Sequence, residues 1–319
     1  MTYYDVFNGD ADGICALTQL RLAQPRDAKL ITGVKRDIQL LEQVQATAGD
    51  VVTTLDVSMK KNMADVERIL ASGAEIFYCD HHDAGNIPQH ENLEALINLD
   101  SNVCTSLLIN GHLNSQYAHW AVTGAFGDNL KQSAVAAAKP LGLNENQLTQ
   151  LENLGIYINY NGYGASLEDL HFTPENLYRE VSQFETPFDF IAQNKAAFEK
   201  LEGGYTEDMA NVASVKPEQA DDAAAVFILP NEKWARRVSG VYSNDLANQN
   251  PDRAHAVLTE KAEGNYLVSI RAPLSNKQGA NEIVGQFPTG GGRAAAAGIN
   301  DLPVDQLAKF IDVFNNYYK

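Results

Sequence analysis

The sequence is poor in the features that mark secreted and membrane proteins. Its 319 residues include three cysteines, Cys15, Cys79 and Cys104, with no Cys-x-x-Cys spacing. The odd number argues against a disulfide framework, and the spacing argues against a zinc knuckle. No run approaches the roughly 20 apolar residues of a membrane helix, and the first residues lack the basic and apolar regions of a signal peptide. We therefore expect a cytoplasmic protein with no membrane partner.

Basic residues are also scarce. The chain has 24 Lys and Arg against 41 Asp and Glu, which gives a formal net charge of −17. A protein that grips long nucleic acid usually presents a basic track, and the overall field here would repel a polyanion. The charge disfavours long nucleic acid as a partner and favours a short phosphorylated ligand held by a few local cations. A homodimer is compatible with the sequence.

Alternating strand and helix patterns fill the first half of the chain. Apolar runs predict strands over 2–8, 28–34, 51–58 and 74–80. Amphipathic patterns predict helices over 14–24, 36–48 and 61–73, and residues 101–200 are largely helical in pattern. Strands that alternate with helices imply crossover connections and a mostly parallel sheet.

A second, smaller domain is predicted towards the C-terminus. Residues 196–222 are polar, with a Gly-Gly pair and an acidic cluster, and are predicted to be a linker. Residues 223–319 contain strand patterns, a Gly-rich loop at 290–292 and a C-terminal helix. We predict an α/β protein: an N-terminal domain over 1–195 with a mostly parallel sheet flanked by helices, a smaller α/β domain, and an active-site cleft between them.

Acidic and histidine residues gather where the predicted strands end. Asp10 and Asp12 follow the first strand, Asp56 ends the third, and Asp80, His81 and His82 end the fourth. Ligands bind where the carboxyl ends of parallel strands open onto one crevice. Three clusters that are distant in sequence are therefore predicted to converge. Asp128, in the segment GAFGDN, follows a predicted helix.

The chemistry of metal ions suits such a convergence. Carboxylates with imidazole bind manganese, iron, magnesium or zinc, and a bridging carboxylate can hold two ions about 3.5–4 Å apart. Taken singly, an Asp-x-Asp pair is usually a solvated loop and a His-His pair is usually surface or core. The occurrence of all of them at successive strand ends favours a metal site. The charged triplet directly after the apolar run IFYC also needs something to pair its charges.

These motifs resemble, in order, the four motifs of the DHH phosphoesterase superfamily. The matching segments are NGDADG, the aspartate of TTLDVS, the triplet DHH and the aspartate of GAFGDN. In the second half, SIRAP and the later ANEIVGQFPTGGGRAAAAGI resemble the DHH-associated C-terminal domain of subtype 1. The resemblance spans most of the chain and implies short-RNA, dinucleotide, single-strand exonuclease or nucleotide phosphatase activity.

The resemblance also implies roles for individual residues. It implies two ions, with Mn²⁺ expected and Mg²⁺ as the alternative. One ion would be held by Asp12, Asp56, His81 and Asp128, and the other by Asp10 and the bridging Asp56. Asp80 would orient a histidine, and His82 would face the substrate phosphate, so Asp56, Asp80 and His82 are the expected catalytic group. The far end of the substrate would contact Arg271, Gly290, Gly291 and Gly292.

The sequence departs from the family pattern at two positions. Val6 stands where the family commonly has a histidine, and Asn8 is expected to supply an amide oxygen to the second ion instead. The C-terminal motif reads GGGR, not GGGH, so Arg293 would offer a fixed planar cation for phosphate or guanine. We expect an altered substrate preference and retained activity.

Two further segments have alternative interpretations. Thr105 and Ser106 lie near the start of a predicted helix and could donate hydrogen bonds to a phosphate, or could be ordinary helix-turn hydroxyls. The segment NYNGYG at 159–164 could stack a base, although a plain turn is favoured.

The leading hypothesis is a two-metal phosphodiesterase that converts linear dinucleotides such as pGpG or pApA, or very short RNA, to mononucleotides. Alternatives within the same chemistry are a single-strand exonuclease and a 3′-phosphoadenosine-type nucleotide phosphatase. A pyrophosphatase is a weaker rival because such relatives lack the Gly-rich second domain. Outside catalysis, the absence of a histidine at Val6 would fit a nucleotide-binding sensor.

Overall fold

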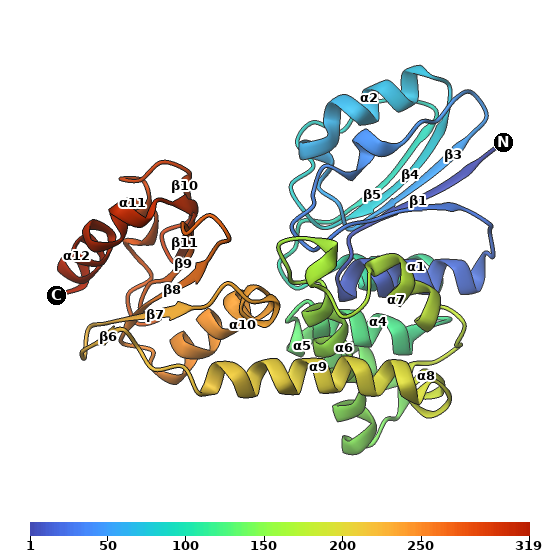
Figure 1. The fold of residues 1–319 in the computed structure, drawn as a ribbon. Helices are drawn as coiled ribbons and strands as arrows, with labels where there is room; N and C mark the ends of the chain where they lie inside the picture. The colour runs from blue at the N-terminus through green and yellow to red at the C-terminus, as the bar shows by residue number, and fades with distance from the viewer. The chain divides into compact units, whose positions relative to one another are not determined.

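The computed structural model describes residues 1–319, which form two compact units, Met1–Tyr205 and Thr206–Lys319. Each unit has its own sheet and its own buried core, and each is described separately below (Figure 1). The predicted α/β class, with a parallel N-terminal sheet and a smaller α/β C-terminal domain, is confirmed.

The first unit is built on a five-stranded sheet with the order β2-β1-β3-β4-β5. All neighbouring strands are parallel. The strands are β1 (Tyr3–Phe7), β2 (Lys29–Ile31), β3 (Val51–Leu55), β4 (Glu75–Asp80) and β5 (Leu93–Ile97). Because the strands are parallel, their carboxyl ends share one edge, where the predicted ligand residues follow them.

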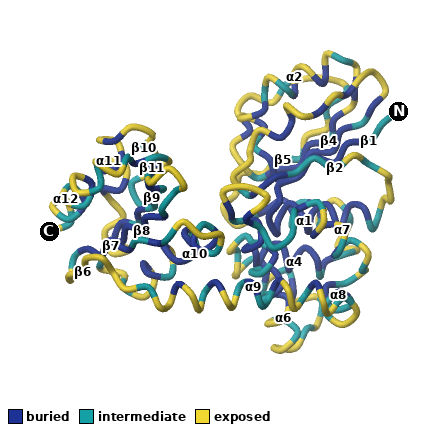
Figure 2. Tube along the Cα trace, viewed as in Figure 1, coloured by how far each residue is buried: buried dark blue, intermediate teal, exposed yellow.

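Helices cover both faces of this sheet. α2 (Met63–Ala71) lies on one face and α1 (Ala11–Ala23) on the other (Figure 1). Each face has a separate buried core, visible as the dark segments along strands and helices in Figure 2. The α1 side carries the remaining helices: α3 (Thr105–His112), α4 (Ala118–Gly127), α5 (Lys131–Ala138), α6 (Glu145–Asn161), α7 (Pro174–Val181), α8 (Pro187–Gln193) and the first part of α9 (Lys195–Ala213).

Four helices of the first unit, α1, α6, α7 and α8, begin at residues whose side chains cap them. The Asp10 carboxylate accepts hydrogen bonds from the first N–H groups of α1. Asn144 forms a reciprocal capping box with Gln147 at the start of α6, and Thr173 caps α7 directly before Pro174. Such caps satisfy N–H groups that have no partner within the helix. At α1 the same carboxylate that starts the helix is also a predicted ligand.

The second unit contains a mixed six-stranded sheet with the order β10-β11-β9-β8-β7-β6. β7 and β8 are parallel, and the other neighbours are antiparallel. Its core lies between these strands and the helices α11 and α12. The elements are β6 (Gln219–Ala220), β7 (Ala224–Leu229), α10 (Lys233–Gln249), β8 (Ala254–Glu260), β9 (Tyr266–Arg271), α11 (Ala280–Val284), β10 (Gly290–Gly292), β11 (Ala296–Leu302) and α12 (Leu307–Tyr318).

The predicted helix over 36–48 is wrong. Only a short 3₁₀ turn forms there, Leu40–Gln43. Side chains from elsewhere take the backbone groups that a helix would need. The Asn62 amide donates to the carbonyl of Ile38, and the Arg68 guanidinium donates to the carbonyls of Leu41 and Val44. Leu41 and Val44 are still buried. The spacing of the apolar residues therefore correctly predicted burial, but the buried residues lie in a loop packed on the sheet and not in a helix.

Three other differences concern a sheet edge, the predicted linker and the Gly-rich loop. β5 was not predicted, because its residues are mostly half-exposed or exposed at the sheet edge and show no clear alternation. The segment 196–222, predicted as a linker, is helical as far as Ala213, because α9 continues through it. The predicted loop at 290–292 is instead the short strand β10.

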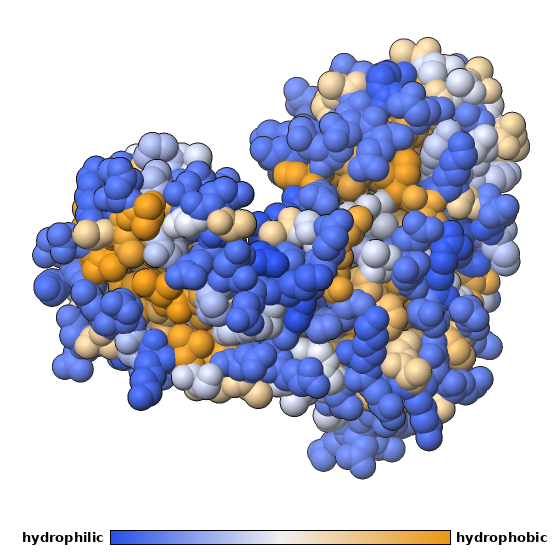
Figure 3. All heavy atoms as spheres, viewed as in Figure 1, coloured by the Kyte–Doolittle hydropathy of each residue, from blue (hydrophilic) through white to orange (hydrophobic).

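The helices include none with both the length and the apolar character needed to cross a bilayer. The face drawn in Figure 3 is largely hydrophilic, with apolar side chains visible in patches over the strands. Cys15, Cys79 and Cys104 are all free and buried. Burial raises the pKa of each of these thiols, so none of them is a reactive thiolate.

Candidate metal centre

The predicted ligand residues meet at the carboxyl edge of the first sheet. Asp56 directly follows β3, Asp80 is the last residue of β4, and Asp10 lies just beyond β1. Asp128 joins them from the C-terminal end of α4, and Asp12 from the first turn of α1. Parallel pairing of β1 with β3 and of β3 with β4 therefore brings together Asp10, Asp56 and Asp80, which span 70 positions of the sequence, and α4 adds Asp128.

His81 is the centre of this group. Its Nε2 lies 3.5 Å from Asp56 Oδ1, 3.8 Å from Asp128 Oδ2 and 3.9 Å from Asp12 Oδ2. Ligands around one ion, at bonds of about 2.1 Å, stand roughly 3–3.5 Å apart. One nitrogen and three carboxylate oxygens are thus spaced slightly wider than a bound ion requires. Among them, Asp12, His81 and Asp128 offer ligand atoms that all lie within 4.8 Å of one another, and Asp56 forms a second such triad with His81 and His82. The two triads share His81, and each could hold a divalent ion.

The Asp12 carboxylate is held by the N-terminus of α3. The backbone N–H of Thr105 donates to Oδ2 and that of Ser106 donates to Oδ1, both at 2.7 Å. The Thr105 hydroxyl donates to Asp56 Oδ1 at 3.2 Å. Both residues are fully buried. The prediction that Thr105 and Ser106 bind a substrate phosphate is therefore wrong, since their N–H groups already bind a carboxylate and position it.

Negative charge in the cluster exceeds what the protein compensates. Burial, with Asp12 and Asp10 nearby, raises the pKa of Asp56 well above its usual range. The same causes raise the pKa of Asp128 to about 8. The buried Oδ2 of Asp80 has no hydrogen-bond partner. Carboxylates that resist ionisation when packed together are the expected mark of a site that needs a cation.

Asp56 also adopts an unusual backbone conformation, with φ at 59°, in the left-handed region. Apart from glycine, this region favours Asn and Asp, and other residues there are strained. The turn directs the Asp56 carboxylate from the end of β3 towards His81 and away from the sheet. Such strain clusters at functional sites, and here it coincides with the residue shared by both predicted ion positions.

His82 lies beside the cluster and has a different set of contacts. Its Nδ1 pairs with Asp80 Oδ1 at 2.7 Å, and its side chain is 46% exposed. This hydrogen bond to Asp80 raises the pKa of His82, although burial opposes the shift. Asp80 therefore orients the ring and leaves Nε2 as the free nitrogen. A protonated His82 can donate from Nε2 to an incoming phosphate.

The second predicted ion position has a different composition. Lys35, which the motif comparison did not single out, places its Nζ 2.6 Å from Asp10 Oδ2. Asp10 Oδ1 accepts the N–H groups of Asp12 and Gly13. Lys35 follows β2, so the same strand-end rule that selected Asp56 could have found it. Although burial opposes it, Lys35 holds the pKa of Asp10 below its usual value, opposite to Asp56 and Asp128.

Neither of the other residues considered for this position provides a ligand. Val6 is fully buried in the core between the sheet and α2. The Asn8 side chain is used locally: its oxygen accepts the N–H of Asp10, and its nitrogen donates to the carbonyl of Lys35. The prediction that Asn8 supplies an ion ligand is therefore not supported by its contacts. Its amide braces the turn between β1 and α1.

The cluster opens into a small pocket of about 130 Å³. Asp10, Lys35, Asp56, His82 and Asp128 are among the residues that line it. The group therefore faces solvent on one side, as a site for substrate must.

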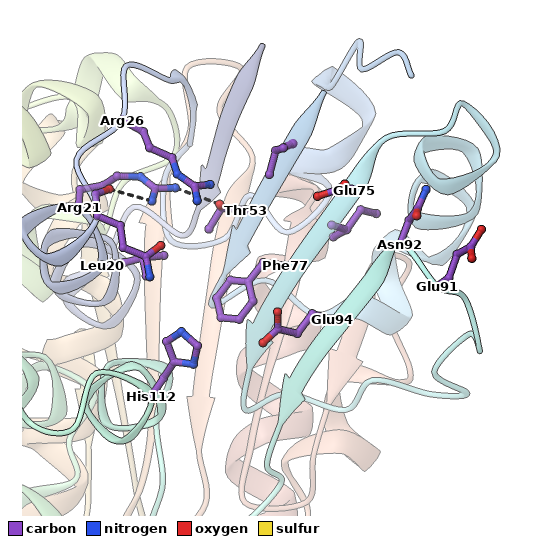
Figure 4. A pocket seen from close by; sticks show the side chains of 13 residues that line it. Leu20, Arg21, Arg26, Thr53, Glu75, Phe77, Glu91, Asn92, Glu94 and His112 are labelled. Atoms are coloured by element: carbon purple, nitrogen blue, oxygen red, sulfur yellow. Dashed lines mark hydrogen bonds between the residues drawn. The ribbon is translucent and has the colours of Figure 1, made fainter. Parts of the chain in front are cut away.

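A larger cavity of about 530 Å³ lies at the opposite edge of the sheet, near the starts of β3 and β4. Figure 4 shows it between α1, with Leu20 and Arg21, and strands carrying Thr53, Phe77 and Glu94. The Arg21 guanidinium is already bonded to Asp5 and Thr53. This cavity has no cluster of ion ligands, so size alone would point to the wrong place.

The substrate-binding residues predicted in the second unit differ in how far they are free to bind. The Arg271 guanidinium donates to Asn244 and Ser269 within the unit. At Gly290, a Cβ would collide with the carbonyl of Val284, so internal packing requires that glycine. Gly291 is exposed with open space around it, and the Arg293 side chain is exposed. Gly292 is exposed as well, although its φ of 143° and the nearby Ala297 require a glycine there. Of these residues, Gly291, Gly292 and Arg293 are exposed to solvent.

Comparisons with known proteins agree with this architecture. Residues 209–319 match the DHHA1 domain family. The predicted DHHA1 domain at the C-terminus is confirmed over these residues, and the fold of the chain is similar to those of solved structures that include a DHH domain. No curated protein matches the sequence.

Three solved structures illustrate the likeness. The manganese-bound exonuclease RecJ matches with a TM-score of 0.67 and 16% identity, covering 99% of this chain and 90% of that chain. The pGpG-specific phosphodiesterase PggH from Vibrio cholerae matches with 0.58 and 16%, covering 99% and 100%. RecJ with Mn²⁺ from Thermus thermophilus matches with 0.65 and 16%, covering 99% of this chain but 52% of that one.

Proposed function

We propose that this chain is a divalent-metal-dependent phosphodiesterase that hydrolyses short nucleotides, linear dinucleotides such as pGpG above all, to mononucleotides. The observation that carries the proposal is the meeting of three carboxylates at His81 Nε2, within 3.9 Å. Solved structures with a similar fold include an exonuclease bound to manganese and a pGpG-specific phosphodiesterase. Mn²⁺ is the proposed ion, with Mg²⁺ as the alternative. In the chain's proposed setting, the reducing cytoplasm, the three buried cysteines stay as thiols.

A divalent ion at this position would supply Lewis-acid activation of water and charge compensation at phosphorus. Asp12, Asp56, His81 and Asp128 would hold it. His82 would present the proton on Nε2 to the phosphate, and Asp80 would keep the ring in place through Nδ1. Gly291 and Arg293 would contact the far end of the substrate. Arg293 suits a phosphate or a guanine edge because its planar fork forms paired hydrogen bonds.

A short substrate is favoured over a long one on two grounds. The net charge of −17 gives a polyanion an unfavourable field at every position outside a local cationic site. The pocket at the cluster is small, about 130 Å³, and Lys35 is the only lysine or arginine that lines it, beside His81 and His82. A pocket of this size takes one phosphate group, not a tract of backbone.

A screen of candidate substrates with Mn²⁺ tests the proposal. The panel contains linear pGpG and pApA, RNA from three to ten nucleotides, long single-stranded DNA and a 3′-phosphorylated adenosine nucleotide. We expect kcat/KM to be highest for a dinucleotide and to fall as length increases. The Asp56→Asn variant, prepared in parallel, is the control for contaminating nucleases, because a contaminant would cleave in both preparations. Asn is chosen because it tolerates the left-handed backbone conformation at position 56. Dominant cleavage of long single-stranded DNA would overturn the short-substrate proposal.

A nucleotide-binding sensor is the non-enzymatic alternative. It predicts that Mn²⁺ and a dinucleotide bind without release of mononucleotides. Isothermal titration beside the cleavage assay separates the two functions, since saturable binding with no turnover for any substrate would favour the sensor.

A further inference from the structure

The position beside Asp10 differs from the His81 position in one decisive way, because it already contains a cation. The Lys35 ammonium lies 2.6 Å from Asp10 Oδ2 and 2.8 Å from Asn159 Oδ1. The ring centroid of Tyr163 is 5.5 Å from the same nitrogen. A carboxylate, an amide oxygen and an aromatic face therefore surround Nζ on the protein side.

The backbone fixes this lysine as firmly as its side chain does. The N–H of Lys35 donates to the carbonyl of Gly162 at 2.8 Å, and its carbonyl accepts from the Asn8 amide at 3.3 Å. The end of α6 and the turn after β1 thus hold the residue from both sides. Its side chain is 28% exposed, and it lines the pocket at the cluster. Lys35 is a built part of the site, not a surface side chain that happens to point inwards.

Asp10 has little capacity left for an ion. A carboxylate has about four lone-pair positions, and three at Asp10 accept hydrogen bonds from Asp12, Gly13 and Lys35. An ion about 2.1 Å from Oδ2 on the pocket side would compete with the ammonium for the same oxygen and would be repelled by it. Val6 and Asn8 supply no replacement ligand. The residues beside Asp10 therefore do not fit an ion at that position.

We propose that the Lys35 ammonium stands in the place of a second divalent ion beside Asp10, so that this chain builds a one-ion centre. The inference deepens the proposed function, on which it rests for the identity of the ion site. The single ion belongs at Asp12, Asp56, His81 and Asp128. The ammonium compensates Asp10 and offers its remaining proton to a phosphate oxygen, which makes Lys35 a substrate-contacting residue. Charge compensation of Asp10 then needs no ion from solution.

Counting ions tests this directly and does not depend on turnover. The full-length protein is titrated with Mn²⁺ by calorimetry, and electron paramagnetic resonance distinguishes a lone ion from an exchange-coupled pair. The wild-type protein should bind one equivalent with the spectrum of an isolated ion. Lys35→Met should bind a second, weaker equivalent and develop the coupled spectrum, because Asp10 is then released. Lys60→Met is the matched control, since Lys60 pairs with exposed Asp83 on the surface.

The outcomes decide between the alternatives. Two equivalents in the wild-type protein, or no binding, would overturn the inference. One equivalent in both the wild type and Lys35→Met would overturn the role of Lys35. If Lys35→Met does not fold, Lys35→Arg replaces it and should retain one equivalent, while the wild-type count still stands as a test. One bound ion without cleavage of any nucleotide would leave this inference intact and overturn the proposed function instead. Two ions with cleavage would do the reverse.

Discussion

The acidic cluster has two sides, one around Asp10 and one around His81, and they differ in the source of the positive charge that compensates their carboxylates. On the Lys35 side, an ammonium 2.6 Å away and two backbone N–H groups satisfy Asp10, and its pKa is lowered. On the His81 side, Asp56 and Asp128 crowd together with raised pKa values and no cation of their own. The folded chain completes one side by itself and leaves the other dependent on an ion. Carboxylates that are neighbours in space can therefore have opposite electrostatic roles.

The largest expected effect comes from removing one carboxylate on each side. Asp56→Asn should reduce kcat on the order of 1,000-fold, since it removes an ion ligand. Asp10→Asn should reduce kcat by about 10–100-fold, because the Asp10 carboxylate acts on the substrate only through Lys35. Asn keeps the left-handed conformation at 56 and the helix cap at 10, so both variants should fold. Equal losses of kcat in the two variants would break the distinction between the sides.

The second effect is on stability without metal. Asp128 has a native pKa of about 8 against 3.8 in the unfolded chain, so the native state binds more protons between these values. Metal-free stability should therefore fall as pH rises from about 4 to 8. Asp10 has the opposite sign: its lowered pKa gives stability at neutral pH that is lost on acidification.

Thermal unfolding in chelator, from pH 4 to pH 8.5, measures this contribution. Asp128→Asn should unfold at a higher temperature than the wild type at pH 8, and the difference should vanish near pH 4. Saturating Mn²⁺ should reverse the order, since an ion stabilises only the native carboxylate. If the wild-type protein is more stable than Asp128→Asn in chelator at pH 8, the cluster does not carry uncompensated negative charge and the prediction is wrong.

A smaller effect on kcat is expected from His82, whose ring is oriented by Asp80. Asp80→Asn should lower kcat by about 10–100-fold, the usual effect of losing a partner that orients a reacting group. It should also move the alkaline limb of the pH–rate profile to lower pH, because Asp80 raises the pKa of His82. The affinity for Mn²⁺ should be little changed. Loss of Mn²⁺ binding together with activity would place Asp80 among the ion ligands instead.

The smallest effect lies outside the cluster. Arg293→Ala should raise KM for dinucleotides by about 10-fold with little change in kcat, as expected when a charged hydrogen bond made equally in both states is lost. Arg179→Ala, on an exposed ion pair of the first unit, is the control. An unchanged KM for every substrate tested would remove Arg293 from recognition.

The sequence predicted the parallel sheet and the meeting of Asp10, Asp12 and Asp56 with the His pair because both follow from a local rule, whereas Asp128 follows a helix and was indicated only by the family resemblance. Buried strands are read from apolar runs, and parallel pairing places their ends together. Contacts between distant side chains had no such signal. The Asn62 and Arg68 bonds that prevent a helix over 36–48 are examples.

The same limit applies within the site. That the start of α3 holds Asp12, 93 residues away in sequence, could not be foreseen from Thr105 and Ser106 alone. The sequence shows that Lys35 follows a predicted strand, but only the structure shows that its ammonium pairs with Asp10.

The hold of α3 on Asp12 has a consequence for how the ion comes and goes. The N–H groups of Thr105 and Ser106 lie 2.7 Å from the Asp12 carboxylate oxygens and fix them without an ion. The ligand geometry is therefore set when the chain folds and not when the ion binds. Chelation should then leave the fold intact, and one ion can be exchanged for another without passage through an unfolded state. Which ion the protein uses would be decided by supply in its surroundings, within the limits that one imidazole and three carboxylates set.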